Sequence, residues 1–241
     1  MDLVYVCRKG ENEELKYSLR SIEKNLPGHN VVVIGYKPSW YCGDFIPVED
    51  IGNKFLNISN CLAYACNTPA ISSNFVFMND DFFLLKPLKR IPKMHGGYLS
   101  DKIDEYRSLV GSSNAYISLL SKTNMKIISK GIDRPIDYDI HVPMQFNKKK
   151  LLSVMINGYL PRSMYGNLFS VGGRAMADVK KYNPRSRLSK RSPSMEDQSL
   201  VFISSDDQSF ETIKNGILLE MFPEPSKYEC PRQESNLRPR D

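Results

Sequence analysis

The sequence predicts an α/β protein with a mainly parallel sheet flanked by helices. Residues 3–7 and 31–35 are short apolar stretches rich in β-branched side chains, which indicates two buried strands. Between them, residues 12–25 are predicted to form a helix, because leucine and isoleucine recur at helical spacing and acids occupy the first turn. A Pro-Gly pair at 27–28 ends this helix. A strand, a helix and a second strand within about 35 residues form a βαβ unit, whose two strands run parallel.

The rest of the chain supplies further elements of the same kind. We expect helices over residues 53–68, 145–156 and 209–219, and strands over residues 75–78 and 200–203. Residues 95–140 are polar and mixed, and no regular element is predicted there. Within that stretch, residues 133–139 are typical of a loop.

The length of 241 residues and a hydrophobic content of 41% predict one compact domain with a substantial core. We place this domain at residues 1–226. Residues 227–241 contain few apolar side chains and show no periodicity, so we expect a disordered tail without a function. Residues 179–194 are rich in Lys, Arg, Ser and Pro, which predicts a mobile loop on the domain.

The formal charge of +6 is concentrated in one place, because residues 180–191 carry six basic side chains and no acid. The remainder is close to neutral, which argues against a protein whose whole surface binds nucleic acid. The basic stretch could contact an acidic acceptor, such as teichoic acid, a lipid phosphate or modified DNA. The alternative is a solvated loop, which is the more common role of a charge run.

Cysteine usage and hydropathy bear on the compartment. The five cysteines are odd in number and form no C-x-x-C pair, which favours reduced thiols over a disulfide framework or a zinc site. The chain starts directly with the first predicted strand, without the features of a signal peptide, and no apolar run approaches the roughly 18 residues of a membrane span. We therefore expect a cytoplasmic protein, with peripheral attachment at the inner face of the membrane as an open alternative.

The main chemical signal is a run of polar residues, Asn79, Asp80 and Asp81, directly after the apolar strand at 75–78. Charged groups are costly in a core, so these acids are expected at the C-terminal edge of the sheet, where open α/β sheets bind ligands. Adjacent carboxylates repel each other unless a cation bridges them. Hard oxygen donors suit Mg²⁺ or Mn²⁺, and these ions neutralise a substrate diphosphate. The alternative is an acidic turn with a helix-capping role.

Three segments, in the same order, resemble the Stealth family of sugar-phosphate transferases of capsule synthesis, which is related to the lysosomal-enzyme GlcNAc-1-phosphotransferase. They are ELKYSLRSIEK at 14–24, ISSNFVFMNDDFF at 71–83 and FPEPSKYE at 222–229. The resemblance runs in patches over residues 2–229. It implies a GT-A-like nucleotide-diphospho-sugar fold. It also implies transfer of a hexose or hexose 1-phosphate from a nucleotide-sugar donor to a cell-surface glycan or polymer.

The same resemblance assigns roles to the acids and to one histidine. Asp80 and Asp81 are implied to hold the metal and the diphosphate, Asp81 with a catalytic role as well, and Asn79 is a candidate for substrate binding. His141 lies in a D-I-H-V-P segment that resembles the catalytic H-x-P segment of the family. Histidine is suited to proton transfer near neutral pH. Without the resemblance, a loop histidine with no chemical role would be the simpler interpretation.

Four further positions are candidates. Arg174 follows two glycines and resembles a phosphate-binding arginine of the family, with an exposed turn residue as the alternative. Asp206, or its neighbour Asp207, matches a late acidic position near the active site and is assigned a catalytic role. Arg20 could face the nucleotide, although an ion pair with a neighbouring glutamate is the simpler role. Trp40 could stack on the donor base or pack at the strand–loop junction.

One departure from the family keeps the reaction open. Capsular members carry an aspartate in an early YTWVDG segment, whereas residues 5–10 here read YVCRKG. Hexose transfer by a short, phage-type enzyme is therefore as compatible with the sequence as hexose-1-phosphate transfer. The alternatives from other classes are a phage DNA-modifying glycosyltransferase, a nucleic-acid-binding accessory protein that uses the basic loop, and an inactive relative that binds a donor without turnover.

Overall fold

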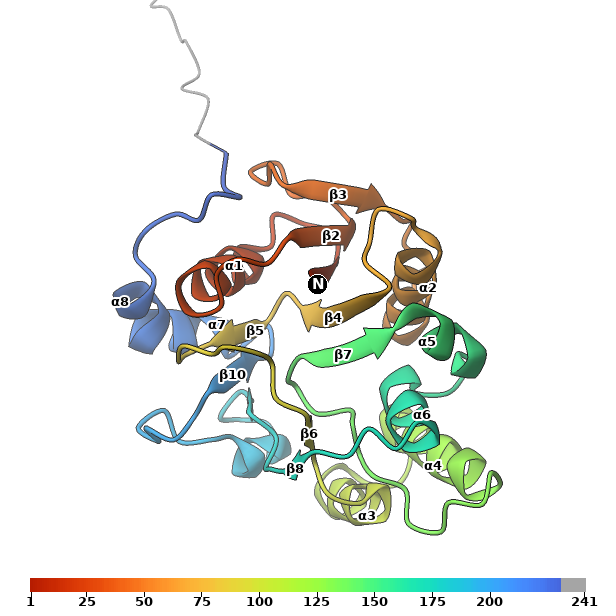
Figure 1. Ribbon diagram of the computed structural model, residues 1–241. Coiled ribbons are helices and arrows are strands. Elements are labelled where there is room, and N and C mark those ends of the chain that lie inside the picture. Colours follow the sequence, from red (N-terminus) through yellow and green to blue (C-terminus); the bar gives the residue numbers. More distant parts are fainter. Residues whose placement is uncertain (231–241) are drawn as a thin grey trace, which may run out of the picture.

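The computed structural model describes residues 1–230, apart from the side chain of Lys54, and is centred on a five-stranded sheet (Figure 1). The strand order is β3-β2-β1-β4-β7, and only β7 runs antiparallel to its neighbour. The strands are β1 (Asp2–Cys7), β2 (Val31–Gly35), β3 (Asp44–Pro47), β4 (Asn74–Asn79) and β7 (Met144–Asn147). The predicted α/β class with a mainly parallel sheet is confirmed.

The central strand β1 is buried on both faces, and its side chains alternate between two cores. Leu3, Tyr5 and Cys7 contact the core that contains α1 (Glu13–Asn25), whereas Val4 contacts the core on the other face. The second core is covered by α2, α5 and α6, which span Lys54–Asn67, Lys148–Val154 and Pro161–Leu168. This period-two alternation is what a strand between two helical layers requires.

A second, three-stranded sheet includes β5, the strand that follows β4 in the sequence. Its order is β5-β10-β9, with bounds Phe82–Leu84, Phe202–Ser205 and Lys180–Lys181. Ser204 is in register with Phe82 on one side and Lys180 on the other. Because β5 begins one residue after Asp81, this register brings Ser204 and Lys180 to the end of the main sheet. A short parallel pair, β6 (Met94–His95) and β8 (Arg174–Ala175), completes the strands of the described part.

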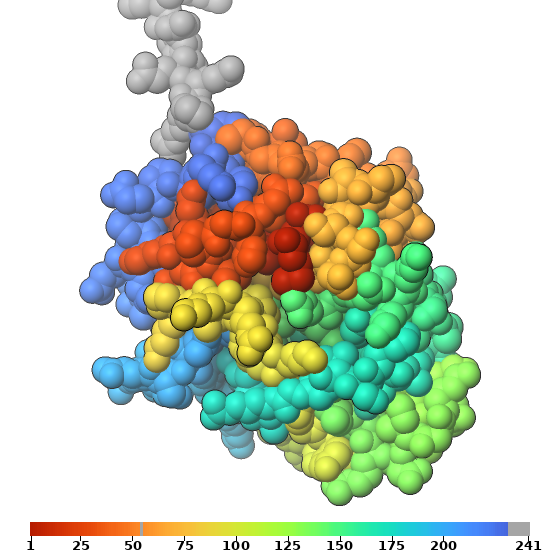
Figure 2. All heavy atoms as spheres, viewed as in Figure 1, coloured from red at the N-terminus to blue at the C-terminus, as the bar shows by residue number. Residues whose placement is uncertain are grey.

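Two helices occupy the stretch for which no element was predicted. They are α3 (Leu99–Val110) and α4 (Ala115–Ile128), and they pack with α6 around a separate apolar cluster that includes Ile103 and Leu120. In the space-filling view they form one end of the molecule, and the blue C-terminal residues lie at the opposite end (Figure 2). The apolar positions have helical spacing, but many charged and hydroxyl side chains separate them, which hid the pattern.

Three other predictions need correction. The helix expected over 145–156 is instead strand β7 followed by α5, because Phe146 pairs with Phe75 of β4. The basic loop at 179–194 contains β9 and a 3-10 helix, η1 (Arg187–Arg191). The helix expected over 209–219 is α7 (Phe210–Ile213), a π-helical turn, η2 (Lys214–Leu218), and α8 (Leu219–Met221).

The start of the predicted disordered tail is packed against the body. Arg20 on α1 makes a two-pronged ion pair with Glu229, with nitrogen–oxygen distances of 2.8 and 2.7 Å. The main-chain N–H of Cys230 donates to the carbonyl of Trp40 at 2.7 Å. The prediction of disorder is therefore wrong for residues 227–230, and residues 231–241 lie outside the described part. Among residues 1–230, no helix combines the length and apolarity needed to cross a bilayer.

Candidate functional site

Asp80 and Asp81 form the turn that links the two sheets. Strand β4 ends at Asn79 and β5 begins at Phe82, so the two acids lie at the C-terminal edge of the main sheet, the position expected from the sequence. Asn79 pairs with Val6 of β1, which places the residues after β1 beside the acids. Parallel neighbours end at the same edge, so the turn after β1 and the turn after β4 build the site together.

Asp81 is held by one of its two oxygens. Its Oδ2 accepts a hydrogen bond from the Ser204 hydroxyl at 2.8 Å and lies 3.4 Å from the Lys180 ammonium. Its Oδ1 is buried and has no hydrogen-bond partner among the described residues. A buried carboxylate oxygen without a partner is unfavourable, because the oxygen has lost water and gained nothing in return. Oδ1 therefore marks a place where a ligand would complete the site.

Asp80 is held by the turn after β1. Its Oδ2 accepts from the Asn12 amide at 2.5 Å and lies 4.0 Å from Nε of Arg8. Burial, together with the charge of Asp81, raises the pKa of Asp80 to about 6. Asn12 adopts a left-handed conformation with φ 43°, which asparagine tolerates better than most residues. Its side-chain oxygen accepts from Leu15 N and caps α1, so one amide both starts the helix and holds the acid.

Arg8 joins acids from two further elements. Its guanidinium donates to Glu14 at 2.7 Å and to Asp207 at 2.6 Å. Glu14 is buried on α1 and also accepts from the Ser205 hydroxyl at 2.9 Å. Burial, and then the charges of the two adjacent aspartates after β4, raises the pKa of Glu14 to about 7. The acids of this edge are therefore crowded, and burial and mutual repulsion both oppose their ionisation.

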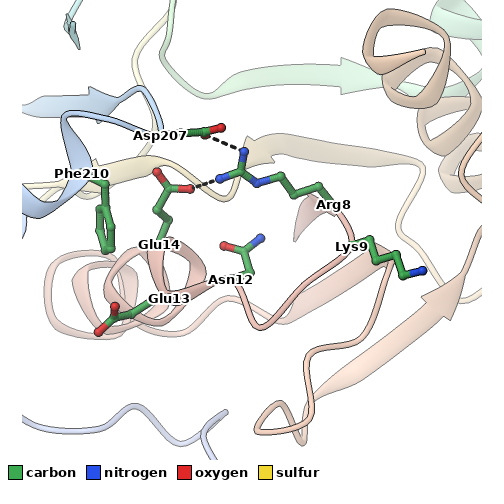
Figure 3. A pocket seen from close by; sticks show the side chains of 7 residues that line it. All are labelled: Arg8, Lys9, Asn12, Glu13, Glu14, Asp207 and Phe210. Atoms are coloured by element: carbon green, nitrogen blue, oxygen red, sulfur yellow. Dashed lines mark hydrogen bonds and ion pairs between the residues drawn. The ribbon is translucent and has the colours of Figure 1, made fainter. Parts of the chain in front are cut away.

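A cavity of about 450 Å³ opens beside these groups (Figure 3). In the close-up, the Arg8 side chain extends between Glu14 and Asp207. The volume falls in the range of ligand-binding clefts. The lining residues are Arg8, Lys9, Asn12, Glu13, Glu14, Asp207 and Phe210.

His141 and Asp178 form an oriented pair. The ring Nδ1 of His141 lies 2.8 Å from Asp178 Oδ2, and the main-chain N–H of His141 donates to Asp178 Oδ1 at 3.0 Å. Burial would raise the pKa of Asp178, but the hydrogen bonds and charge of His141 and the nearby Lys102 hold it below its usual range. Burial lowers the pKa of His141, so the ring is neutral near neutral pH. The carboxylate therefore favours the Nδ1–H tautomer, which leaves Nε2 as the proton acceptor.

The charges of Lys180 and Asp81 both influence the pKa of His141, so the histidine shares the electrostatic neighbourhood of the acid pair. Burial and the charge of Asp178 act on the same ring. The structure thus places Asp80 and Asp81 side by side and lets the charge of Asp81 reach His141, although no hydrogen bond or ion pair among residues 1–230 joins His141 to either acid.

Two buried cations fix the loop that carries His141. Arg162 on α6 donates to the main-chain carbonyls of the residues on either side of His141, at 2.7 Å each. Lys102 on α3 bonds Asp137 Oδ2 at 2.9 Å and the carbonyl of Asp139 at 2.8 Å. Helix α3, which was not predicted, therefore contributes a buried lysine that stabilises the loop that carries His141.

Arg174 is not joined to this group. It lies exposed on β8, where its main-chain N–H donates to the carbonyl of Lys93 at 3.0 Å. Within the described part of the chain, no hydrogen bond or ion pair connects its guanidinium to the acid pair or to His141. Its predicted phosphate-binding role stays a prediction.

The two late acids behave differently. The Asp206 carboxylate accepts from the main-chain N–H groups of Ser209 at 2.8 Å and Asn183 at 3.1 Å, so it stabilises the turn before α7. Asp207 is the one that contacts the site, through Arg8. The sequence offered both residues, and the geometry favours Asp207 over the preferred Asp206.

Arg20 and Trp40 are engaged in packing. Arg20 forms an ion pair, as the simpler interpretation expected, but its partner is Glu229 and not a glutamate of its own helix. The Trp40 ring N–H donates to the carbonyl of Glu11 at 2.5 Å, and the Lys16 ammonium lies 5.1 Å from the ring centre. The contacts of both side chains are those of a structural role.

Sequence reasoning missed several residues that the fold brings to the site: Arg8, Asn12, Glu14, Asp178, Lys180 and Ser204. The sequence pointed to two of them only indirectly, because Arg8 lies in the segment that departs from the family and Lys180 lies in the basic stretch. Glu14 looked like an ordinary acid in the first turn of a helix, where acids are common. Its burial is visible only in three dimensions.

The carboxylates of Asp80 and Asp81 fit a cation that is also bound by substrate oxygens better than a cation enclosed by protein ligands alone. Among residues 1–230, no group of three or more His, Cys, Asp or Glu side chains is arranged to hold a metal ion. Mg²⁺ is often bound by one or two carboxylates plus substrate phosphates and water. Asp80 and Asp81, with the unpartnered Oδ1 of Asp81, match that arrangement.

No family model matches the chain. The capsular polysaccharide phosphotransferase LcbA of Neisseria meningitidis is 25% identical over 159 residues, which cover 57% of this chain and 43% of that protein. The chain thus spans less than half the length of this relative.

Two solved glycosyltransferases are partly similar in structure. The galactosyltransferase LgtC, solved with donor and acceptor sugar analogues, has a TM-score of 0.43 and 13% identity, and the match covers 85% of this chain and 87% of that one. The glycosyltransferase GlyE of Streptococcus pneumoniae TIGR4 has a TM-score of 0.33 and 11% identity, with 73% and 44% covered. At these scores the likeness is partial, and the α/β class rests on the observed sheet itself.

The raised pKa of Glu14 predicts a pH dependence of stability. Between the ordinary value of 4.5 and the folded value of about 7, the unfolded chain is ionised while the folded protein keeps the proton, so stability falls as pH rises through this window. We expect Glu14→Gln to be more favourable, relative to wild type, at pH 8 than at pH 5. Urea unfolding at both values measures this. Glu220→Gln, at an exposed position on α8, is the control, and an equal effect of Glu14→Gln at both values would contradict the prediction.

Proposed function

We propose that this chain is a transferase with a GT-A-like active site, which takes a sugar or sugar phosphate from a nucleotide-diphospho-sugar donor. The observation that carries the proposal is the buried Oδ1 of Asp81, which has no partner among residues 1–230 and lies at the C-terminal edge of the sheet. The neighbouring Asp80 contacts Asn12 and Arg8, which line a cavity of ligand size. Mg²⁺ or Mn²⁺, held by Asp80 and Asp81, would supply the positive charge that a diphosphate needs.

The surrounding side chains support this role. Lys180 and Ser204 fix Asp81 through Oδ2, which leaves Oδ1 without a partner among residues 1–230. Arg8 stands at the cavity wall, where a guanidinium can bind phosphate oxygens through two parallel hydrogen bonds. Phosphoryl and glycosyl transfer from a diphosphate depend mainly on positioning and on neutralising the leaving group, and these residues can do both.

His141 would act on the acceptor. Asp178 holds the ring through Nδ1, so Nε2 can take a proton from an acceptor hydroxyl. The lowered pKa of His141 keeps the ring in its basic form near neutral pH. Arg162 and Lys102 fix the loop, so the ring meets the acceptor in one orientation.

The acceptor and the transferred group are inferred from the relative and from the sequence. The name of the relative LcbA, a capsular polysaccharide phosphotransferase, supports a cell-surface glycan or polymer as acceptor and a phosphate-containing transferred group. Hexose 1-phosphate would be such a group. The absence of an acid in residues 5–10 supports hexose transfer. Such an acceptor also suits an enzyme in the cytoplasm at the inner face of the membrane.

The nucleic-acid alternatives depend on the basic stretch at 180–191, and three of its six basic side chains already contact other protein groups. Lys180 pairs with Asp81, Lys181 bonds the carbonyl of Pro193, and Arg191 pairs with Glu105. The exposed remainder is Arg185, Arg187 and Lys190. A DNA-binding role would predict salt-dependent binding that survives Asp80→Ala, and a DNA glycosyltransferase would transfer sugar to hydroxymethylated DNA.

The central test is a thermal-shift screen of UDP-, GDP-, CDP- and dTDP-sugars with and without Mn²⁺. We expect one donor class to raise the melting temperature in the presence of Mn²⁺, because a ligand that binds only the folded state stabilises it. Asp81→Asn keeps the shape and the Ser204 contact but should abolish the shift. Asp104→Asn, at an exposed site on α3, is the matched control. Stabilisation by no donor, or equal stabilisation of Asp81→Asn, would rule the proposal out.

With the donor identified, label on its β-phosphate and on its sugar separates the two reactions. Both labels in the product indicate hexose-1-phosphate transfer, and the sugar label alone indicates hexose transfer.

A second prediction concerns His141. We expect His141→Gln to lower kcat by about 10²–10⁴-fold, the usual contribution of a general base, while the donor-induced thermal shift is kept. The wild-type rate should rise with pH up to the lowered pKa of His141 and level off above it, and the variant should lack this limb. His29→Gln, in the loop before β2, is the control. An unchanged pH profile in His141→Gln would show that another group accepts the proton.

A further inference from the structure

Arg8 is the point where three acids of different elements meet. It follows β1, and its guanidinium contacts Glu14 of α1 at 2.7 Å and Asp207, between β10 and α7, at 2.6 Å. Its Nε lies 4.0 Å from Asp80 at the end of β4. One cation thus balances carboxylates that would otherwise repel one another across the edge of the sheet.

The Arg8 side chain is half exposed, whereas two of its partners are largely buried. The Arg8 side chain is 52% exposed, and those of Glu14 and Asp80 are 6% and 15% exposed. Asp207, at 73%, is also exposed. The guanidinium borders the cavity, as Figure 3 shows, so it can turn away from the buried acids without disturbing the core.

A second observation points to a ligand at the same place. Asp81 is only 8% exposed, and its Oδ1 has no partner among residues 1–230. Lys180 is 3.4 Å from the other oxygen, Oδ2. Arg8 and Lys180 therefore partly balance the acids, but the contacts leave one buried oxygen for a further positive group.

We propose that Arg8 is a built-in counter-ion, which competes with a divalent cation for the acids so that the cation and the anionic donor bind together. A cation that arrives alone meets the positive guanidinium among its ligands. A cation that arrives with a diphosphate brings Arg8 a new bidentate partner, which releases the carboxylates. This inference rests on the proposed cation role of Asp80 and Asp81, and it adds an order of binding.

The test uses Mn²⁺ alone, followed by the electron paramagnetic resonance signal of the free ion. We expect Arg8→Met to bind Mn²⁺ at least about tenfold more tightly than wild type, because a positive charge within a few ångströms of the ligands has been removed. Arg8→Lys keeps the charge and should stay close to wild type. Arg107→Met, which removes an exposed arginine paired with Asp104, is the matched control.

A second arm tests the coupling. Inorganic pyrophosphate should strengthen Mn²⁺ binding to wild type and strengthen it less in Arg8→Met, after correction for the complex that the two form in solution. Arg8→Gln repeats both arms if Arg8→Met does not give a cooperative melt. Equal Mn²⁺ affinity in wild type and the neutral variants would overturn the counter-ion role.

The outcome is separable from the proposed function, because no sugar donor is used. Tighter Mn²⁺ binding in Arg8→Met supports the counter-ion role even where the donor screen fails. A successful donor screen with equal Mn²⁺ affinities overturns the counter-ion role alone. The absence of Mn²⁺ binding in every variant overturns the counter-ion role, and the donor screen with Mn²⁺ then decides the proposed function separately.

Discussion

The constraint on which this structure depends is the placement of two adjacent carboxylates, Asp80 and Asp81, in a largely buried turn between two sheets. Like charges in such a site cannot both ionise without compensation. The turn after β1 and the second sheet supply this compensation. The turn after β1 gives Arg8 and Asn12, and the second sheet gives Ser204 and Lys180.

This requirement also explains the second sheet. Strand β5 leaves Asp81 at once, and β10 pairs with it so that Ser204 donates to the acid. Strand β9 then pairs with β10 and brings Lys180 to the same oxygen. The charge of Asp81 remains without a partner at Oδ1 among residues 1–230, and we propose that a divalent cation occupies this place when a diphosphate binds.

The sequence was informative where local patterns determine structure. The βαβ unit followed from apolar runs around an amphipathic helix, and the acids were placed correctly because charge cannot stay inside a strand. Helices α3 and α4 were not predicted, because their apolar positions are diluted by polar ones and gain meaning only through packing with α6. For the same reason β7 looked helical, since its pairing with β4 cannot be read from its own residues.

The site shows the same division. His141 was found through a short motif, but its partner Asp178 was not, because the two are brought together only by the fold. Arg8 and Glu14 carried no signal of their own, and their importance comes from the register of β1 with β4 and from the burial of α1. Asp206 was preferred over Asp207, although only the geometry around Arg8 could distinguish them.

We propose above all that Asp80 and Asp81 hold a divalent cation against a diphosphate. Anomalous diffraction at the manganese edge, from crystals grown with Mn²⁺ and a nucleotide diphosphate, tests it most directly. We expect one strong peak next to Oδ1 of Asp81 and to Asp80, with phosphate oxygens on its other side. A nucleotide bound with no peak at these two acids, or with the manganese at another site, would contradict it.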